Sequence, residues 1–356
     1  MSERIDQLRA RLTLSDLDAL LSLDAVTNRY LSGFAGSTSA VIVTANRAIL
    51  VTDFRYSEQA SAEVVGFELR EATDFYMREV CKALSDTGSG RVGFEPDRMT
   101  VKSYREVQDW LSTVELVAVD GLVSKLRACK DRVELEDIRR AAAIASDVVG
   151  EVPSIVKEGM SERELAAEIE YRIRNKGADG TSFDAIALFG ERSSLPHGEP
   201  TERRLAAGDI VLVDLGARCN GYNSDLTRTW VYHRIRTSRA KEVYEIVRSA
   251  QEASLAAARA GMSCADFDAV GRAVIRESGY GANFGHGLGH GVGLEVHEAP
   301  RISGQSSEQL EEGMVVTVEP GIYVPGEGGV RIEDLVLVTA AGCEVLTEAD
   351  KRFAVI

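Results

Sequence analysis

An internal repeat in the second half of the chain constrains the fold more than any other feature. The triplet Gly159-Met160-Ser161 recurs as Gly261-Met262-Ser263, an offset of 102 residues, and Gly177 recurs as Gly279 at the same offset. Each copy predicts a helix that begins after a serine N-cap and ends at a glycine suited to a C-cap, and Glu164 completes a capping box in the first copy. Self-similarity at this distance indicates a duplicated domain.

The strands expected after these helices repeat as well. The run Gly208–Asp214 resembles Gly313–Glu319 at an offset of 105, and each run ends in a carboxylate. A turn and a second acid, Asp225 or Glu333, follow each run. A carboxylate in an apolar strand is costly unless something pairs with it. A pseudo-twofold arrangement would place all four acids around one point, where divalent cations could bind.

Two histidines lie in a glycine-rich segment of the second half, and a third lies shortly after it. His286 and His290 lie in Gly285–Gly291, which contains too many glycines to form a helix. In an extended chain residues four apart face the same way, so both imidazoles can enter one cleft. His297 comes seven residues later, whereas His197 by itself suggests a surface loop.

Each of these residues also has a simpler structural interpretation. Asp214 could cap the turn at Gly216, Asp225 could pair with Arg228 in a hairpin, and Glu319 could be a turn residue before Pro-Gly. Taken together, at matching positions of a repeat and beside imidazoles, they are better explained as metal ligands, because hard and borderline divalent cations bind oxygen donors with one or two imidazoles.

The first part of the chain has a different pattern. Up to about residue 125 it reads as mixed α/β, with strands expected at 40–43 and 48–51 and helices at 57–65 and 101–111. An Ala-rich and charged helix is expected at 133–149. A chain of 356 residues is long enough for two domains, so we expect domains at 1–125 and 126–356.

Composition excludes several classes of function. The net charge is −15 with no basic cluster, which argues against a nucleic-acid or anionic-membrane partner. Five scattered cysteines without a CxxC pair favour a reducing compartment, so we expect a cytoplasmic protein. The start MSERIDQLRARL is not typical of a signal peptide, and no apolar run approaches the ~20 residues of a membrane span.

The motifs VDLGA, SDLTRT, HGLGHGVGLEVHE, VEPGIY and VRIEDLVLV resemble those of the pita-bread metallopeptidases, in the branch of Xaa-Pro dipeptidases (prolidases) and aminopeptidase P. Asn28-x-Tyr30-Leu31-x-Gly33-Phe34-x-Gly36-Ser37 and Thr52-Asp53-x-Arg55-Tyr56 are similar to the N-domain of that branch. The resemblance implies an α/β (α+β) fold, with a creatinase-like N-terminal domain followed by a duplicated, pseudo-twofold pita-bread catalytic domain.

The resemblance also implies a set of metal ligands for two divalent ions. Asp214 would chelate one ion, His290 and Glu319 would bind the second, and Asp225 and Glu333 would bridge both. Manganese is expected, while cobalt and zinc are compatible with the same ligands.

The implied reaction is hydrolysis of Xaa–Pro bonds in dipeptides or short peptides, by a hydroxide that bridges the metals. Glu319 would transfer the proton to the leaving nitrogen. The three catalytic histidines would be His197, His286 and His297, with His197 and His297 contacting the substrate and stabilising the oxyanion.

Arg301 is the residue expected to set substrate length. Its guanidinium would bind the C-terminal carboxylate of a dipeptide, a role that the resemblance to some prolidases also suggests. The simpler alternative is a solvated loop arginine or one paired with Glu298 or Glu327. The alternative activities are aminopeptidase P, acting on longer peptides, and a non-catalytic pita-bread binding protein. The resemblance also implies a homodimer.

Overall fold

The computed structural model describes residues 2–236 and 238–356. Contacts between residues divide the chain into two compact units, one ending at Arg127 and the other running from Ala128 to Ile356. The sequence places this boundary near residue 125. Within the described residues, no helix is both long enough and apolar enough to cross a membrane.

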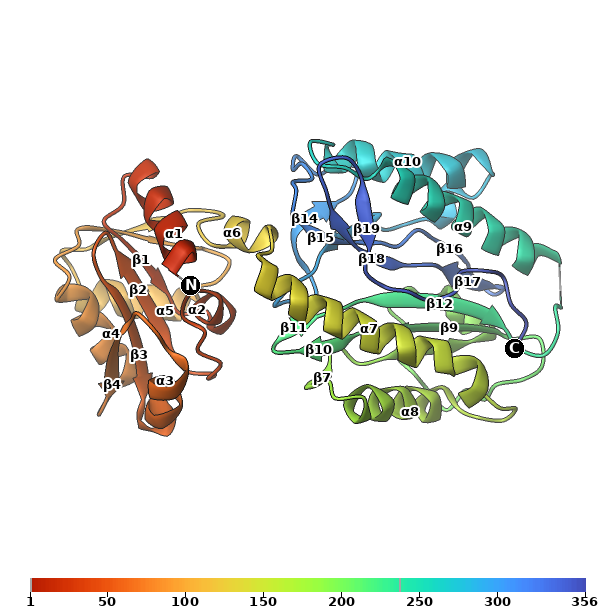
Figure 1. Cartoon of the computed structure of the whole chain (residues 1–356), viewed down its shortest axis with the longest axis horizontal. Helices are drawn as coiled ribbons and strands as arrows, with labels where there is room; N and C mark the ends of the chain where they lie inside the picture. Colours follow the sequence, from red (N-terminus) through yellow and green to blue (C-terminus); the bar gives the residue numbers. More distant parts are fainter. Residues whose placement is uncertain (1, 237) are drawn as a thin grey trace. The chain divides into compact units, whose positions relative to one another are not determined.

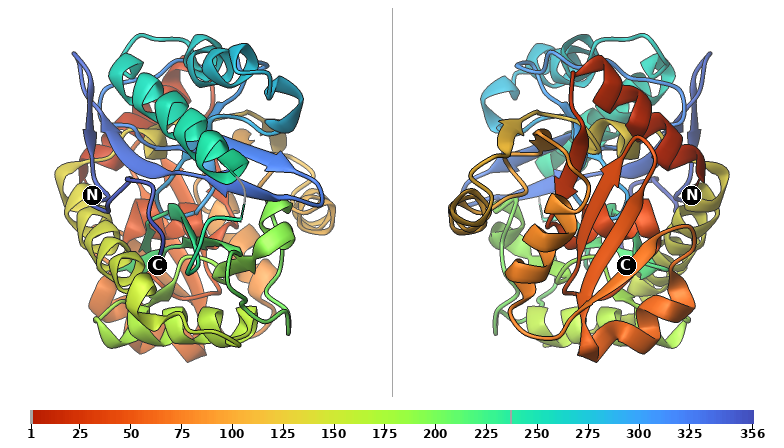
Figure 2. Two further views of the ribbon diagram at one scale, coloured as in Figure 1. Left: turned by 90° about the vertical axis from the view of Figure 1, so that its right-hand side faces the viewer. Right: turned by 90° about the vertical axis from the view of Figure 1, so that its left-hand side faces the viewer.

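The N-terminal unit is organised around a mixed β-sheet, drawn in red to light orange in Figures 1 and 2. Its described strands are β1 (Ala19–Ser22), β2 (Ala40–Thr44), β3 (Ala48–Asp53), β4 (Glu68–Ala72), β5 (Arg91–Phe94) and β6 (Glu115–Ala118). The strand order is β4-β3-β2-β1-β5-β6. β1 pairs antiparallel with β2 and parallel with β5. The strands expected at 40–43 and 48–51 are confirmed as β2 and β3.

Helices pack on this sheet through alternate residues of its strands. Ile42 and Val51 share one buried cluster with Val80 and Leu84 of the helix α4 (Tyr76–Ser85), because successive side chains of a strand point to opposite faces. The helices expected at 57–65 and 101–111 are confirmed, each with slightly shorter bounds. The helices of this unit are α1 (Ser2–Leu14), α2 (Ala25–Ser32), α3 (Ser57–Glu63), α4 (Tyr76–Ser85), α5 (Val101–Trp110) and α6 (Ser124–Ala128), with the 3₁₀ turn η1 (Phe54–Tyr56).

Two pairs of helices enclose the strands of the C-terminal unit. Figure 1 shows α7 (Arg132–Ile155) and α8 (Glu162–Asn175) on one side of the strands, and α9 (Ser238–Ala257) and α10 (Cys264–Glu277) on the other. The helix expected at 133–149 is longer than predicted. It continues to Ile155 because the buried apolar face extends through Val152.

The predicted repeat is visible in the bounds of the elements. α8 and α10 each contain 14 residues at the offset of 102, with Ser161 and Ser263 as N-caps. The capping box between Ser161 and Glu164 is present. Gly177 and Gly279, just beyond the two helices, have φ angles of 92° and 87°, a left-handed conformation that glycine adopts without strain.

The strands of the two halves also correspond. β9 pairs antiparallel with β12 in the first half, and β15 pairs antiparallel with β18 in the second. The strands of the first half are β7 (Gly180–Thr181), β8 (Ile186–Phe189), β9 (Ile210–Leu215), β10 (Ala217–Cys219), β11 (Tyr222–Asn223) and β12 (Leu226–Val231), with η2 (Gly190–Ser194). Those of the second are β13 (Gly289–Gly291), β14 (Glu298–Ile302), β15 (Val315–Val318), β16 (Gly321–Val324), β17 (Gly328–Arg331), β18 (Asp334–Val338) and β19 (Cys343–Val345), with η3 (Gly281–Asn283).

A buried ion pair joins the two halves. Arg228 of β12 and Asp334 of β18 are 1% and 0% exposed in their side chains, and their Nη2 and Oδ1 atoms lie 2.7 Å apart. Arg228 also donates to the backbone carbonyl of Glu333. Asp334 accepts further hydrogen bonds from Gln251 and Lys351, both at 2.7 Å. The alternative pairing of Arg228 with Asp225 is therefore not the one that forms.

We expect Asp334→Asn to lower the free energy of unfolding of the C-terminal unit by about 3–5 kcal/mol, because Arg228 would remain buried without its counter-charge. Urea unfolding followed by circular dichroism measures the change. Glu344→Gln is the control, because it breaks a half-exposed pair with Arg139 and should cost about 1 kcal/mol or less. Equal losses for the two variants would contradict the importance of the buried pair.

Candidate metal centre

A cavity of about 780 Å³ opens in the C-terminal unit. Every residue that the sequence assigned to the site contributes to its lining, although these residues come from both halves of the repeat. They are Asp214, Asp225, His290, Glu319 and Glu333, proposed as ligands, with His197, His286, His297 and Arg301.

The ends of the two hairpins position the four acids. Asp214 is the penultimate residue of β9, and Asp225 immediately precedes β12. Glu319 immediately follows β15, and Glu333 immediately precedes β18. Each hairpin thus presents two carboxylates at the same end, as the repeat predicted.

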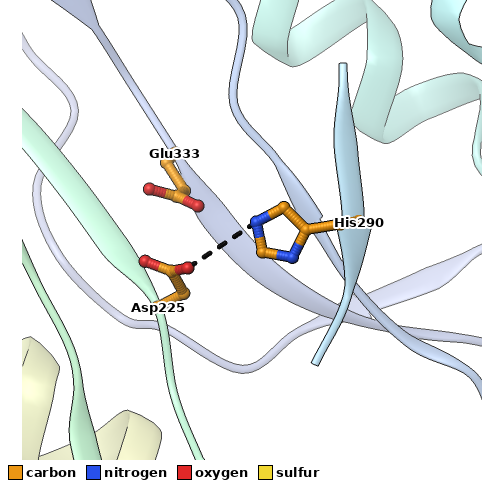
Figure 3. Close-up of side chains that lie close together, drawn as sticks. All are labelled: Asp225, His290 and Glu333. Carbon is orange, nitrogen blue, oxygen red and sulfur yellow. Dashed lines mark ion pairs between the residues drawn. The ribbon is translucent and has the colours of Figure 1, made fainter. Parts of the chain in front are cut away.

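His290 faces these carboxylates from β13. Ligand atoms of Asp225, His290 and Glu333 all lie within 4.8 Å of one another, and Figure 3 shows the two carboxylates opposite the imidazole. The His290 Nε2 atom is 3.8 Å from Asp225 Oδ2 and 3.4 Å from Glu319 Oε1. Oxygen donors with one imidazole suit manganese, cobalt or zinc.

Asp214 provides a test of whether a cation fits. Its Oδ2 atom accepts a hydrogen bond of 2.6 Å from Arg331, whereas its buried Oδ1 atom has no hydrogen-bond partner among the described residues. A buried polar atom without a partner is unusual in a protein. Because it belongs to an acid that lines the cavity with other acids, a metal ion would satisfy it.

The electrostatics of the cavity favour a bound cation. Burial, and then repulsion by neighbouring carboxylates, raises the pKa of Asp225 and of Glu333 well above the usual range. Burial raises the pKa of Glu319 to about 7. Burial also lowers the pKa of His290 to about 4, so its imidazole is neutral and free to bind a metal near neutral pH. A divalent cation would favour the charged form of all three acids.

The glycines of the His286–His290 segment allow strands to approach closely. A Cβ atom on Gly289 would lie 2.1 Å from the carbonyl oxygen of Thr317, and one on Gly291 would lie 2.1 Å from that of Ala299. Any larger residue would push the segment away from β15 or β14. The glycine-rich composition therefore reflects backbone packing that brings His290 to the acids.

A buried acid on α10 also holds this segment. Asp268 accepts the backbone N–H of Leu288 at 2.9 Å and pairs with Arg272. Arg272 in turn donates to the carbonyls of Phe284 at 3.0 Å and His286 at 2.7 Å. The backbone on both sides of His286 is therefore fixed to a helix.

The remaining histidines of the site line the same cavity as the proposed ligands. The rings of His290 and His297 lie 4.3 Å apart between centroids, and the His286 Nε2 atom is 2.9 Å from the Tyr323 hydroxyl. Burial lowers the pKa of His286 to about 4 and also lowers that of His297. His197 lies in the loop between η2 and β9 and is exposed at the cavity.

Arg331 and Tyr323 are two further residues of the site, and the sequence alone did not indicate a role for them. Arg331 is 3% exposed and donates to Asp214, to Thr227 Oγ1 at 2.9 Å and to the Tyr323 hydroxyl at 2.9 Å. Since Tyr323 also contacts His286, a continuous hydrogen-bonded chain connects Asp214 to that histidine. The sequence contained one signal for Arg331, its spacing from Glu333. Residues two apart in an extended chain face the same side, so Arg331 could have been expected to point toward the acids.

Arg301 lies on β14 rather than in a loop. It is the strand partner of His290, and directly paired residues project from the same face of a sheet. The two acids considered as its partners are bound elsewhere, Glu298 to Lys130 at 2.7 Å and Glu327 to Arg239 at 2.6 Å. Its side chain is exposed and lines the cavity.

Known proteins resemble this chain over nearly its whole length. A peptidase of Bacillus subtilis (strain 168), the uncharacterized peptidase YqhT, is 40% identical over 99% of this chain and 100% of its own length. The Xaa-Pro dipeptidase from Bacillus anthracis superposes with a TM-score of 0.97 at 40% identity, covering 100% of this chain and 99% of its own. The X-Pro aminopeptidase from Thermotoga maritima MSB8 has a TM-score of 0.89 at 37% identity, covering 96% and 98%.

Two family models match the chain. The Creatinase/Prolidase N-terminal domain matches residues 4–129, and metallopeptidase family M24 matches residues 136–340. The expected creatinase-like N-terminal domain and metallopeptidase catalytic domain are thus confirmed. The second match covers more than half of the chain and includes all five proposed ligands, so the chain belongs to metallopeptidase family M24.

Proposed function

We propose that this protein is a metal-dependent Xaa-Pro dipeptidase. The observation that carries the proposal is the meeting of four carboxylates and a neutral imidazole in one cavity, with an exposed arginine beside them. The similarity to an Xaa-Pro dipeptidase over the whole chain supports the same conclusion.

The proposed centre holds two divalent cations, manganese being expected. Asp214 would hold one of them, His290 and Glu319 would hold the other, and Asp225 and Glu333 would contribute to both. The supporting observations are the 4.8 Å cluster of Asp225, His290 and Glu333, and the unpartnered Oδ1 atom of Asp214. Hydroxyl groups orient the acids: Thr227 donates to Glu333 at 2.6 Å and Thr317 to Glu319 at 3.3 Å. Such hydrogen bonds commonly orient metal ligands.

Bound cations would supply Lewis acidity, which would activate a water molecule and polarise the carbonyl that precedes proline. Glu319 accepts the proton of the attacking water and passes it to the imino nitrogen of the leaving proline. His297 and His197 donate N–H groups to the oxyanion that develops on the carbonyl oxygen. His286, which Tyr323 holds at 2.9 Å, orients the substrate beside Glu319.

Arg301 is proposed to distinguish a dipeptidase from aminopeptidase P. Its guanidinium, on the same sheet face as His290, would bind the C-terminal carboxylate of a dipeptide through a bidentate contact. A longer peptide has no carboxylate at that position. The similarity to an X-Pro aminopeptidase keeps aminopeptidase P as the second candidate. A binding protein without activity is disfavoured, because every proposed ligand is present.

Two further properties are proposed. The protein is expected to be a homodimer, as the resemblance to the pita-bread metallopeptidases implies, and its N-terminal unit carries none of the assigned site residues. A cytoplasmic location is proposed because all five cysteines are free, as expected in a reducing compartment.

We expect Asp225→Asn and Glu333→Gln each to abolish peptidase activity while the fold survives, because a neutral amide of nearly the same shape cannot bridge two cations. Activity in manganese-replete buffer, bound metal by elemental analysis and circular dichroism are the measurements. Glu327→Gln is the matched control outside the cavity. A variant that retains more than about a tenth of the wild-type rate would contradict the bridging role.

We expect Arg301→Ala to raise KM for an Xaa-Pro dipeptide by the equivalent of about 1.5–3 kcal/mol, the value of a charged hydrogen bond. The KM for an Xaa-Pro-Xaa tripeptide should barely change. Steady-state kinetics with both substrates measure the difference, with Arg239→Ala as the control. Unchanged dipeptide kcat/KM would refute the carboxylate-binding role of Arg301 and favour aminopeptidase P.

We expect light scattering at micromolar concentration to give about twice the 38.6 kDa mass of the chain. A dimer with closed twofold symmetry is the commonest assembly among soluble oligomers. A monomeric mass in a preparation with full activity would show that the dimer is not needed.

A further inference from the structure

A buried carboxylate outside the cavity faces the loop that carries His197. Glu162 is the first residue of α8 and is fully buried. Acids are almost never fully buried unless they are paired, so each of its contacts is informative. Glu162 does not line the cavity, so it has no direct role in the metal centre.

The Glu162 carboxylate binds both ends of the loop between Phe189 and Thr201. Its Oε1 atom accepts the backbone N–H of Phe189 at 2.9 Å. Its Oε2 atom accepts the backbone N–H of Thr201 at 2.9 Å and the Thr201 hydroxyl at 2.7 Å. A single side chain therefore closes a loop whose ends are twelve residues apart in sequence.

Arg192 extends this contact to the middle of the loop. Its Nε atom lies 3.1 Å and 3.0 Å from the two oxygens of Glu162, so it balances the buried charge. Its Nη2 atom donates to the carbonyl of Glu199 at 2.7 Å. Glu199 is two residues beyond His197, so the backbone is held on that side as well.

The position of His197 depends on this backbone. Its side chain is exposed, and within the described residues no hydrogen bond of its ring is found. The carbonyl of the preceding residue, Pro196, accepts a hydrogen bond of 3.2 Å from Arg331. The loop is thus fixed at its ends by Glu162 and near His197 by an arginine of the metal centre.

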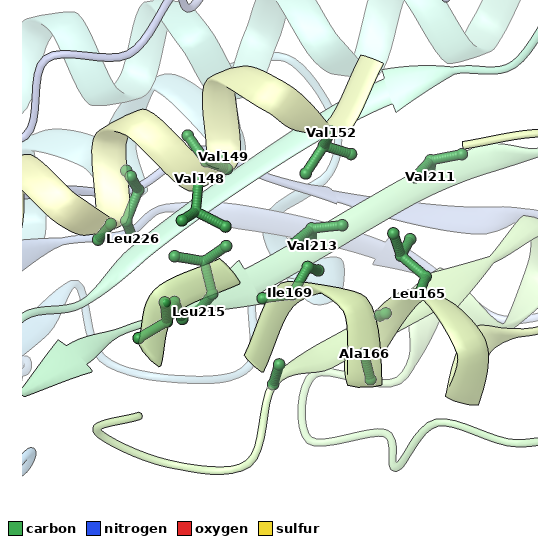
Figure 4. Close-up of a cluster of buried hydrophobic side chains, with 14 of the residues drawn as sticks. Val148, Val149, Val152, Leu165, Ala166, Ile169, Val211, Val213, Leu215 and Leu226 are labelled. Carbon is green, nitrogen blue, oxygen red and sulfur yellow. The ribbon is translucent and has the colours of Figure 1, made fainter. Parts of the chain in front are cut away.

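The helix that carries Glu162 is itself firmly anchored. Leu165 and Ile169 of α8 belong to the same buried cluster as Val211 and Val213 of β9, and Figure 4 shows these side chains facing one another. β9 also carries Asp214, a proposed ligand. The helix that carries Glu162 therefore packs directly against the strand that carries a proposed ligand.

We propose that Glu162 is a positioning residue that fixes His197 over the metal centre by clamping both ends of its loop. The proposal rests on the catalytic role given above to His197. The pair formed by Asp268 and Arg272 holds the His286 segment in a similar way, so each half of the duplicated unit fixes one histidine segment with a buried acid–arginine pair.

The test uses Glu162→Gln, whose amide cannot balance Arg192 or accept all the donors that the carboxylate accepts. We expect kcat to fall about 10- to 100-fold, as misplacement of a catalytic group by about 1 Å can do, with a much smaller change in KM. Bound metal should remain at the wild-type level, since the loop carries no proposed ligand. Hydrogen exchange at the Phe189 and Thr201 amides should accelerate. Thr201→Val removes only the hydroxyl that donates to Glu162 and should show the same effects more weakly. It provides the test if Glu162→Gln does not fold.

A double-mutant cycle with His197→Ala separates positioning from general stability. If Glu162 acts through His197, the double variant should be no slower than His197→Ala alone, because coupled groups are not additive. Glu95→Gln is the matched control. Glu95 is also buried and also accepts two backbone N–H groups and a hydroxyl, from Val123 and Ser124, so its loss should affect stability and not kcat.

These experiments test the positioning role of Glu162 separately from the catalytic role proposed for His197. Wild-type kcat in Glu162→Gln, or a double variant whose losses multiply, would overturn the clamp while His197→Ala still shows a defect. Wild-type activity of His197→Ala would instead remove the role proposed for that histidine, and the clamp with it.

Discussion

The buried ion pair between Arg228 and Asp334 is the interaction on which the rest of the metal centre depends. It connects β12 of the first half to β18 of the second, and the acids Asp225 and Glu333 lie immediately before these two strands. A buried ion pair is stable only when further hydrogen bonds satisfy the remaining donors and acceptors of both charged groups. Arg228 donates to backbone carbonyls, and Asp334 accepts hydrogen bonds from Gln251 and Lys351. The two hairpins are therefore held in register by a contact that involves no metal.

Unlike the Arg228–Asp334 pair, the carboxylates of the cavity are destabilised in their charged forms. Burial and mutual repulsion oppose the charged forms of Asp225 and Glu333, and Arg331 pairs with only one oxygen of Asp214. A fold optimised for stability alone would not gather these groups. Local conflicts of this kind are expected at functional sites, and here the conflict is resolved if divalent cations bind.

The segments that carry the histidines of the cavity are held by charged residues outside its lining. Asp268 and Arg272 fix the backbone around His286, and Glu162 closes the loop of His197. Lys130, whose side chain is fully buried, pairs with Glu298 next to His297. Functional groups on loops need such support to keep a productive geometry. Each segment thus combines irregular backbone with at least one buried ionic contact.

Much of this molecule could be predicted from local sequence. Helix caps at Ser161 and Ser263, the glycine-rich path of His290 and the acids at strand ends all depend on short-range geometry, and the repeat shows that two such units face each other. The partners of Arg228 and Arg331 could not be predicted. They lie about a hundred residues away along the chain or depend on which face of a strand is buried, and only the packing of the two halves brings them together. Local sequence preferences determined which helices and strands form and which side chains lie at their ends. The burial of charged groups in the folded unit determined which of those side chains pair.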